Sequence, residues 1–340
     1  MQALFGKTLD ELQSLVVEMG LPKFTGKQIA DWLYKKKVAS VDDMTNLSKK
    51  ARAMLSENFE VGTFPPVKVQ KSTDGTKKYL FPTAHGKYIE TAMIPDKERQ
   101  TVCVSSQVGC KMGCLFCMTG KQGFNGQLTA GEIVNQVQMI EETDHITNIV
   151  YMGMGEPFDN LEEVLKSIDI LTSDWGYAMS PRRITVSTIG IVPALKRFLN
   201  ESKCNLAISV HTPFDDERQK LMPVQLAYPL KSVIDEIRAF DFDSQRKVSF
   251  EYIVFGGLND TSRHVKEMNR LLNGVRSHIN LIRFHPIPGT PLEKTDEQRL
   301  QRFKDELNNK GLLTTIRASR GQDIYAACGM LSTKGLQKDS

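Results

Sequence analysis

The sequence predicts an α/β protein built on a parallel sheet that closes into an incomplete barrel. The first observation is that apolar, strand-like segments alternate with amphipathic, helix-like segments from residue 100 onward. Six such strand–helix units and one further strand occur, which fits an incomplete barrel better than an eight-unit one. The second observation is that four of the six cysteines lie between Cys103 and Cys117, at the end of the first of these strands. Ligands gather at that end of parallel strands, so we expect the functional site there.

Residues 1–60 predict a small helical domain. Three amphipathic segments, 8–21, 26–38 and 46–59, have apolar residues at helical spacing, and Thr8 is suited to cap the first. The domain carries two basic runs, Lys35-Lys36-Lys37 and Lys49-Lys50-Ala51-Arg52. A solvated helix face explains such runs in most proteins, and binding to an RNA backbone is the functional interpretation.

Residues 61–99 predict a short β-rich connection between the helical domain and the barrel. The segments 68–72, 77–82 and 87–95 are strand-like, and the turn-forming pairs Asp74-Gly75 and His85-Gly86 separate them. Residues 100–331 form the predicted barrel, and 332–340 read as a polar tail. The expected barrel strands are 101–107, 147–154, 182–190, 204–212, 247–255, 279–286 and 312–319.

Composition restricts the class of protein. A net charge of +4 permits a nucleic-acid partner without requiring one. We expect no signal peptide and no membrane helix, because no window approaches the roughly 18–20 continuous apolar residues that a membrane span needs. Six cysteines in 340 residues are too few and too clustered for a secreted disulfide scaffold. We therefore expect a cytoplasmic protein in which the clustered thiols serve metal or redox chemistry.

Cys110, Cys114 and Cys117 form a C-x3-C-x2-C motif in a loop rich in glycine. Soft thiolates select zinc or iron–sulfur clusters. A structural zinc ion needs a fourth ligand, and none follows at zinc-finger spacing, since His145 lies in a different predicted element. A four-iron cluster held by three thiolates would instead leave one iron open for chemistry.

This motif, with Phe116 before its last cysteine, resembles that of the radical S-adenosylmethionine (SAM) superfamily. A closer resemblance is to the RlmN-type adenine-C2 methyltransferases, which act on 23S rRNA and tRNA. It rests on the ordered motifs CVSSQVGC, CMTGKQGFN, MGMGEP, RRITVSTIG, SVHTP, LMP, GLND and DIYAACG, and on GLPKFTGKQIADWLYKK near the N-terminus. It implies a radical SAM barrel with a helical RNA-binding domain.

The resemblance also assigns roles to individual residues. Cys110, Cys114 and Cys117 would hold one [4Fe-4S] cluster, whose free iron binds the amino and carboxylate groups of SAM. Cys328 matches the cysteine that carries a methyl group, Cys103 matches the resolving cysteine, and Glu90 occupies the position of a general base. Expected SAM contacts are Gly155, Glu156, Ser187, Ser209, Val210, His211 and His285.

The implied mechanism uses two molecules of SAM. The first methylates Cys328, and cleavage of the second gives a 5′-deoxyadenosyl radical that takes a hydrogen atom from the new methyl group. The carbon radical adds to C2 of adenine, and Glu90 removes the C2 proton. Cys103 then attacks the Cys328 sulfur, which forms a transient disulfide and releases the methylated base.

His285 departs from the family pattern, because a close relative carries Asn at this position. A histidine ring nitrogen can still bond a ligand, so we keep His285 among the expected SAM contacts. Arg317 and Arg320, near the Cys328 segment, could hold phosphate, although surface arginine is the default interpretation.

The resemblance implies further partners: 23S rRNA in the peptidyl-transferase region, the tRNA adenosine next to the anticodon, and an electron donor such as flavodoxin with its reductase. We expect a monomer. The main competing interpretation is a Cfr-type enzyme, which methylates adenine C8 and confers antibiotic resistance; Val108, Pro157 and the Arg320-Gly321 pair argue against it. Two weaker interpretations are a non-catalytic RNA-binding protein and a radical SAM enzyme that acts on a small metabolite.

Overall fold

The structure, a computed structural model, describes residues 1–242 and 246–333. Its strands are β1 (Gln2–Ala3), β2 (Phe59–Glu60), β3 (Lys68–Lys71), β4 (Lys77–Pro82), β5 (Tyr88–Asp96), β6 (Arg99–Cys103), β7 (Gln107–Gly109), β8 (Phe124–Gln127), β9 (Asn148–Tyr151), β10 (Ile184–Thr188), β11 (Asn205–Ser209), β12 (Val248–Val254), β13 (His278–Arg283) and β14 (Leu313–Ile316).

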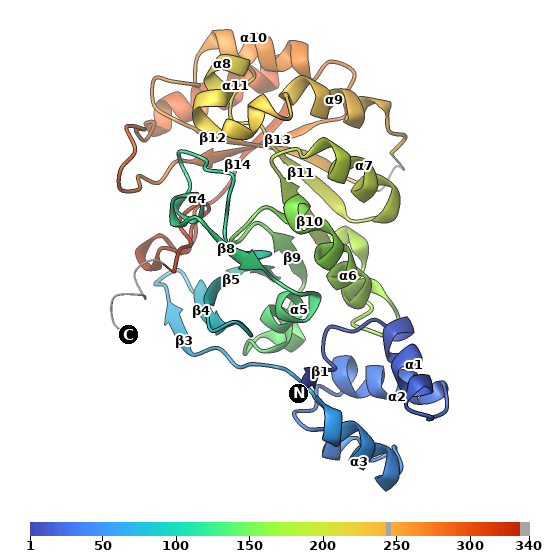
Figure 1. Cartoon of the computed structure of the whole chain (residues 1–340). Coiled ribbons are helices and arrows are strands. Elements are labelled where there is room, and N and C mark those ends of the chain that lie inside the picture. The colour runs from blue at the N-terminus through green and yellow to red at the C-terminus, as the bar shows by residue number, and fades with distance from the viewer. Residues whose placement is uncertain (243–245, 334–340) are drawn as a thin grey trace.

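The α-helices that the structure describes are α1 (Leu9–Glu18), α2 (Phe24–Ala30), α3 (Lys49–Asn58), α4 (Met118–Gln122), α5 (Ala130–Gln138), α6 (Leu161–Thr172), α7 (Val192–Glu201), α8 (Asp215–Leu221), α9 (Leu230–Ala239), α10 (Ser262–Leu271) and α11 (Glu297–Asn309). Helices α5–α11 cover the outside of the sheet (Figure 1).

The predicted parallel barrel is confirmed. One ten-stranded sheet runs in the order β14-β13-β12-β11-β10-β9-β6-β5-β4-β3, and its strands from β6 through β14 pair in parallel. The inner strands are short and apolar, and Val186, Leu206 and Phe250 have no exposed surface. The parallel arrangement brings the C-terminal ends of seven strands to one rim, which is where the site lies.

The connecting segment extends this same sheet. Strands β3, β4 and β5 pair antiparallel with one another, and β5 pairs antiparallel with β6. In this register Ala92 on β5 lies opposite Cys103 on β6. The three strands predicted from residues 68–95 are therefore present, and β5 forms one wall beside the first barrel strand.

The N-terminal helices begin and end largely where the sequence predicts. Thr8 caps α1 through a reciprocal capping box with Glu11, and the second predicted helix continues beyond α2 as a π-helical turn, Asp31–Lys35. In Figure 1 these helices lie at the end of the molecule far from α8 and α10. Two ion pairs, Lys37–Asp144 at 2.6 Å and Lys166–Glu11 at 2.7 Å, link the N-terminal helices to the barrel.

One element of the cysteine region was not predicted. Strands β7 and β8 form a small antiparallel hairpin that flanks the cysteine loop, and α4 follows Cys117 directly. At the other end of the chain, Ser332 and Thr333, the first residues of the expected tail, are hydrogen-bonded to Glu90 and Gln122. The rest of that tail, residues 334–340, lies outside the described residues. None of the described helices has the length and apolar character that a membrane crossing requires.

Candidate active site

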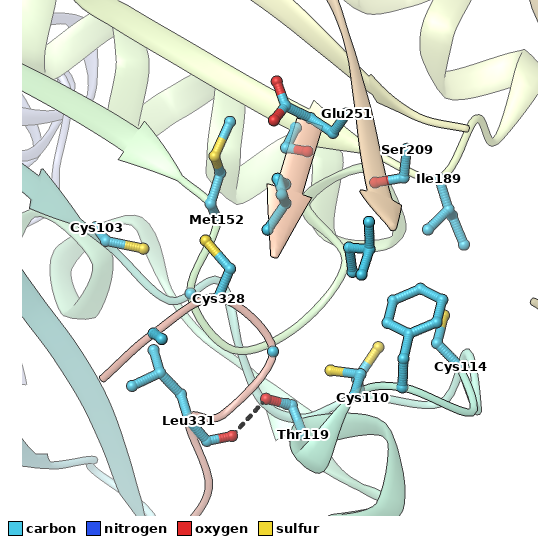
Figure 2. Close-up of a pocket in the computed structure, with 18 of the residues that line it drawn as sticks. Cys103, Cys110, Cys114, Thr119, Met152, Ile189, Ser209, Glu251, Cys328 and Leu331 are labelled. Carbon is cyan, nitrogen blue, oxygen red and sulfur yellow. Dashed lines mark hydrogen bonds between the residues drawn. The ribbon is translucent and has the colours of Figure 1, made fainter. Parts of the chain in front are cut away.

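A cavity of about 240 Å³ lies at the C-terminal rim of the barrel strands. Eleven of the thirteen predicted site residues line it: Cys103, Cys110, Cys114, Cys117, Gly155, Glu156, Ser187, Ser209, His211, His285 and Cys328. Figure 2 labels Cys103, Cys110, Cys114, Ser209 and Cys328 around the cavity, with the Cys328 loop approaching from the side opposite Ser209. Glu90 and Val210 lie outside the lining.

The β7–β8 hairpin sets the shape of the cysteine loop. Gly109, at φ +72°, ends β7, and a Cβ there would lie 1.7 Å from the carbonyl oxygen of Gly123. The Cys110 N–H donates to that same oxygen at 3.1 Å, which closes the loop. Only glycine permits this approach of the two backbones, and the result is that Cys110, Cys114 and Cys117 face one cavity.

The three thiols fit a [4Fe-4S] cluster in their chemistry, because thiolates are the ligands of such clusters and all three thiols face one cavity. Among the described residues, no group of three or more His, Cys, Asp or Glu side chains is close enough to hold one metal ion. The thiols of Cys110 and Cys114 are buried, and both interact electrostatically with the Cys117 thiol.

Cys103 and Cys328 meet at the other side of the cavity. Cys103 is buried at the end of β6, whereas Cys328 is exposed on the loop after β14, and both are free thiols. In Figure 2 the Cys103 sulfur points toward Cys328 and Met152. Burial, followed by the Cys328 thiol, raises the pKa of Cys103 to about 12. The predicted disulfide is absent among the described residues, so it stays a prediction about a reaction intermediate.

The Cys328 loop is fastened to the cysteine loop by hydrogen bonds. The Met118 N–H donates to the Gly329 carbonyl oxygen at 2.8 Å, and the Thr119 hydroxyl donates to the Leu331 carbonyl oxygen at 2.7 Å. The side-chain oxygen of Gln122 accepts from the Thr333 N–H at 3.0 Å. The position of Cys328 is thus linked directly to the segment that follows Cys117.

The glycines near Cys328 have a packing reason that sequence alone did not give. Gly321 has φ +64°, and a Cβ there would lie 2.8 Å from Ala326 Cβ and 2.9 Å from Thr76 Cγ2. Gly329 has φ +79°. Both glycines adopt a left-handed backbone conformation that other residues disfavour, so they define the course of the loop.

Glu90 lies behind the cavity wall rather than in it. Its carboxylate forms a buried ion pair with Lys78 at 2.9 Å and accepts a hydrogen bond from the Ser332 N–H at 2.9 Å. Its backbone carbonyl accepts from the Ser105 hydroxyl at 2.6 Å. Both carboxylate oxygens are therefore engaged, one of them by the segment that follows Cys328.

The turn after β9 requires glycine and buries a carboxyl group. Gly155 has φ +99°, and a Cβ there would lie 2.5 Å from Gln107 Cβ. The Glu156 carboxylate accepts from the Thr188 hydroxyl at 2.6 Å and from the Ile189 N–H at 3.1 Å. Burial raises the pKa of Glu156 to about 7 despite these hydrogen bonds. Glu156 thereby joins the end of β9 to the end of β10.

His211 is a neutral, fixed ring at the cavity wall. Its Nδ1 accepts from the Ile253 N–H at 3.0 Å, so the neutral ring carries its proton on Nε2. The ring packs edge-on against Phe116 with centroids 4.7 Å apart, and burial followed by Arg218 lowers its pKa to about 3. The neighbouring Val210 is fully buried, and its N–H donates to the Glu251 carbonyl oxygen.

The remaining predicted contacts lie at the ends of three strands. Ser187 is on β10, Ser209 ends β11, and His285 follows β13. The Nε2 atom of His285 is 3.0 Å from the Ser319 hydroxyl oxygen, and burial lowers its pKa. The ring is thus uncharged near neutral pH and already has a hydrogen-bond partner.

Sequence reasoning did not single out Glu251 or Met152, which both line the cavity, and it took a surface position as the default for Arg317, which lines the cavity too. Glu251 is buried on β12 and forms an ion pair with Arg317 at 3.3 Å. Arg320, three residues on, pairs instead with Asp96 at 3.2 Å. A carboxylate within the apolar strand KVSFEYIVF was the available signal, because such a group needs a buried partner.

The fold and the cysteine loop define a radical SAM enzyme. The Radical SAM superfamily profile matches residues 104–271, and that of the ribosomal RNA large subunit methyltransferase N-terminal domain matches residues 2–61. The crystal structure of a radical SAM methyltransferase from Sphaerobacter thermophilus matches with a TM-score of 0.91 and 40% identity, covering 97% of this chain and 99% of that chain.

Curated relatives narrow the class to one family. A probable dual-specificity RNA methyltransferase RlmN from Parabacteroides distasonis is 56% identical over 330 residues, covering 97% of this chain and 96% of the relative. The dual-specificity RNA methyltransferase RlmN of Nautilia profundicola is 43% identical over 348 residues, covering 97% of this chain and 98% of the relative. The chain belongs to the RlmN family of radical SAM methyltransferases, and not to the Cfr type. The family's cofactors are a [4Fe-4S] cluster and SAM.

Proposed function

We propose that this enzyme methylates C2 of adenosine in 23S rRNA, in the peptidyl-transferase region, and in tRNA, at the adenosine next to the anticodon. The similarity to dual-specificity RNA methyltransferases supports an RNA substrate. The observation that carries the choice of mechanism is that two separate sets of thiols face one cavity. Cys110, Cys114 and Cys117 come from one loop, while Cys103 and Cys328 come from distant parts of the chain.

Each set of thiols has its own task in this proposal. The loop cysteines hold the [4Fe-4S] cluster, which when bound supplies the electron that cleaves SAM. Cys328, exposed on its loop, accepts a methyl group and then carries it to the base. Cys103, buried beside it, attacks the Cys328 sulfur to release the product. A thiolate and a second sulfur within reach are what such an exchange requires.

The chain's own residues also orient SAM. The glycine turn around Gly155 lets backbone approach a ligand at the end of β9, and Glu156 fixes that turn against β10. The fixed tautomer of His211 offers an Nε2–H donor at the wall of the cavity. Ser187, Ser209 and His285 complete the polar lining on the neighbouring strand ends.

We propose that Glu90 removes the C2 proton only after the Cys328 loop has shifted. In the described conformation Ser332, four residues beyond Cys328, occupies one carboxylate oxygen, and Lys78 occupies the other. Movement of the loop toward bound RNA would free the first oxygen.

We propose that residues 1–60 bind RNA and that residues 61–99 connect them to the barrel of residues 100–331. Lys35 and Lys36 have half-exposed side chains that pair weakly with Asp31. Lys37 instead bonds Asp144 and Thr143 on the barrel, so it fastens the domain rather than facing RNA. The target base would have to leave its stack to reach Cys328 at the cavity.

Mass spectrometry of adenosines tests the proposed function. Protein-free 23S rRNA and bulk tRNA would be incubated with anaerobically reconstituted enzyme, SAM and reductant, with Cys328→Ala as control. We expect 2-methyladenosine that disappears in the control. The appearance of 8-methyladenosine, or SAM cleavage without any methylated adenosine, would refute the proposal.

The remaining parts of the proposal concern the cellular setting. We propose a monomer in the cytoplasm that receives electrons from flavodoxin and its reductase. A reducing compartment keeps Cys103 and Cys328 as thiols between turnovers, and the reaction needs them in that form. Reduction of the cluster by purified flavodoxin in place of dithionite tests the electron donor.

A further inference from the structure

Arg317 is a cavity residue whose position is fixed by an anionic partner. It follows β14, and its guanidinium forms an ion pair with Glu251 at 3.3 Å. The same Nη1 atom lies 3.4 Å from the sulfur of Met152. Figure 2 shows Met152 between Glu251 and the sulfurs of Cys103 and Cys328.

Three adjacent strands hold this arrangement in place. Glu251 Oε1, on β12, accepts from the Asn280 amide on β13 at 2.8 Å and from the Ser249 hydroxyl at 3.0 Å. The Arg317 carbonyl oxygen accepts from Arg283 at 2.9 Å. These bonds fix the guanidinium in place before the reaction. It can therefore stabilise a negative charge that develops beside it with little reorganisation.

The guanidinium lies within electrostatic range of both sulfurs of the exchange. Cys103 packs with Ala326, and Met152 packs against that pair, which places Arg317 next to the same cluster. Burial raises the pKa of Cys103, the Cys328 thiol raises it further, and Arg317 lowers it. Within the described residues, the other neighbours of Cys103 on β5 and β9, Ala92 and Val150, carry no charge.

The exchange step needs a negative charge at a buried atom. The Cys103 thiolate attacks the sulfur of Cys328, which is bonded to the methylene carbon on the base. An S–S bond forms and the S–C bond breaks, and the electron pair passes to the carbon, which takes up a proton to become the methyl group. The two sulfurs are oxidised by two electrons and the carbon is reduced by two, so no further oxidant is required.

We infer that Arg317, held by Glu251, is a positioning residue for this exchange: its guanidinium stabilises the Cys103 thiolate beside the sulfur of Cys328. The inference rests on the proposed function, since the thiolate is needed only if the base is released by Cys103. It assigns Arg317 to the last step and to neither methylation of Cys328 nor cleavage of SAM.

Single-turnover reactions with reconstituted enzyme, SAM, reductant and tRNA test the inference. In Arg317→Met we expect the covalent RNA–protein adduct to persist and 2-methyladenosine to appear about tenfold more slowly, because a smaller fraction of the attacking thiol would be ionised. The amounts of methylated Cys328 and 5′-deoxyadenosine should equal those of the wild type. Arg317→Lys, which keeps the charge, should restore most of the rate.

Two further variants separate charge from folding. Arg317→Met leaves Glu251 buried without its partner, so the double variant Glu251→Gln/Arg317→Met removes both charges and should show the same slow release. Arg299→Met breaks a comparable ion pair, with Asp260 at 2.8 Å on the outer layer, and should release product at the wild-type rate.

The rate of alkylation of Cys103 by iodoacetamide provides an independent measurement. Alkylation would be followed by peptide mass spectrometry in a Cys328→Ser background. The pH at which the alkylation rate is half-maximal should rise in Arg317→Met and stay near the parent value in Arg317→Lys. If Arg317→Met released product at the wild-type rate and its alkylation midpoint were unchanged, the inference about Arg317 would be overturned and the proposed function would still stand. Absence of 2-methyladenosine from the wild type would instead overturn the proposed function.

Discussion

The two sets of thiols at the cavity are built in opposite ways. Cys110, Cys114 and Cys117 lie in one loop, closed by the β7–β8 hairpin and by the approach of Gly109 to Gly123. Cys103 and Cys328 come from the first barrel strand and from the last loop, and each depends on different neighbours. The first set is a local structure, whereas the second exists only when the whole barrel is formed.

This difference matches the chemistry proposed for each set. A cluster needs ligands at fixed spacing, which a short loop supplies by itself. A sulfur exchange needs one thiol to reach the substrate and a second to be kept apart from it until the end. Cys328 is exposed and Cys103 is buried, so the two demands are met by different elements.

The largest contrast is expected between cysteine variants. Cys114→Ala should lose most of its iron and all SAM cleavage, because two thiolates hold the cluster poorly. Cys103→Ala should keep its iron and SAM cleavage but release no 2-methyladenosine. Iron content and 5′-deoxyadenosine yield measure the difference. Loss of iron in Cys103→Ala as well would show that the two sets are not independent.

A matched pair of glycine variants sharpens the comparison. In Gly109→Ala the new Cβ would lie 1.7 Å from a backbone oxygen at φ +72°, so the cysteine loop should open and iron content fall severalfold. In Gly321→Ala the clash is with Ala326, on the Cys328 loop, so iron should stay bound while turnover falls about tenfold. Equal iron loss in both variants would contradict the proposal that the cysteine loop alone holds the cluster and that the Cys328 loop serves a later step.

Glu156, in the wall of the cavity, should make the free energy of unfolding depend on pH independently of either set of thiols. Its pKa is raised from 4.5 to about 7, so the folded state binds the proton more tightly than the unfolded state. The resulting stability is fully present below about pH 4.5 and is lost as the pH rises through 7, a change of about 3 kcal/mol. The free energy of unfolding of the wild type, measured with denaturant, should decrease between about pH 4.5 and pH 7. The free energy of unfolding of Glu156→Gln should decrease less over the same pH range. An identical decrease would refute the assignment of the pH dependence to Glu156.

The smallest effect is expected outside the barrel. Lys35→Glu/Lys36→Glu should weaken tRNA binding about threefold at 150 mM salt by repelling phosphate, with SAM cleavage unchanged. Lys231→Glu is the control, because Lys231 also pairs with an aspartate one helical turn away, at 2.6 Å on α9. Equal weakening by the control would mean that the effect is one of net charge and not of the N-terminal domain.

The sequence predicts what is decided locally. Thr8 caps its helix, the strand–helix units occur in the predicted order, and the cysteine spacing fits the loop that the structure describes. The β7–β8 hairpin escaped prediction because QVG and FNGQ are too short to show a period of two. Family resemblance, rather than any pattern in the residues, pointed to Cys328.

The rest depends on contacts between distant segments. The bonds of Glu90 to Lys78 and Ser332 join three separate parts of the chain, and no pattern in any one of them indicates the contact. The same holds for Glu251 and Arg317, which meet only because β12 and β14 both flank β13. Pairing of buried charges is a property of the assembled sheet.

The most direct test of the account is to trap the joint action of the two cysteines. Cys103→Ala enzyme would be incubated with SAM, reductant and tRNA, digested with protease and nuclease, and analysed by mass spectrometry. We expect one cross-linked peptide in which Cys328 is joined through a methylene group to C2 of adenosine. SAM cleavage without any cross-link, or a cross-link at another residue, would contradict the proposed division of work among the cysteines.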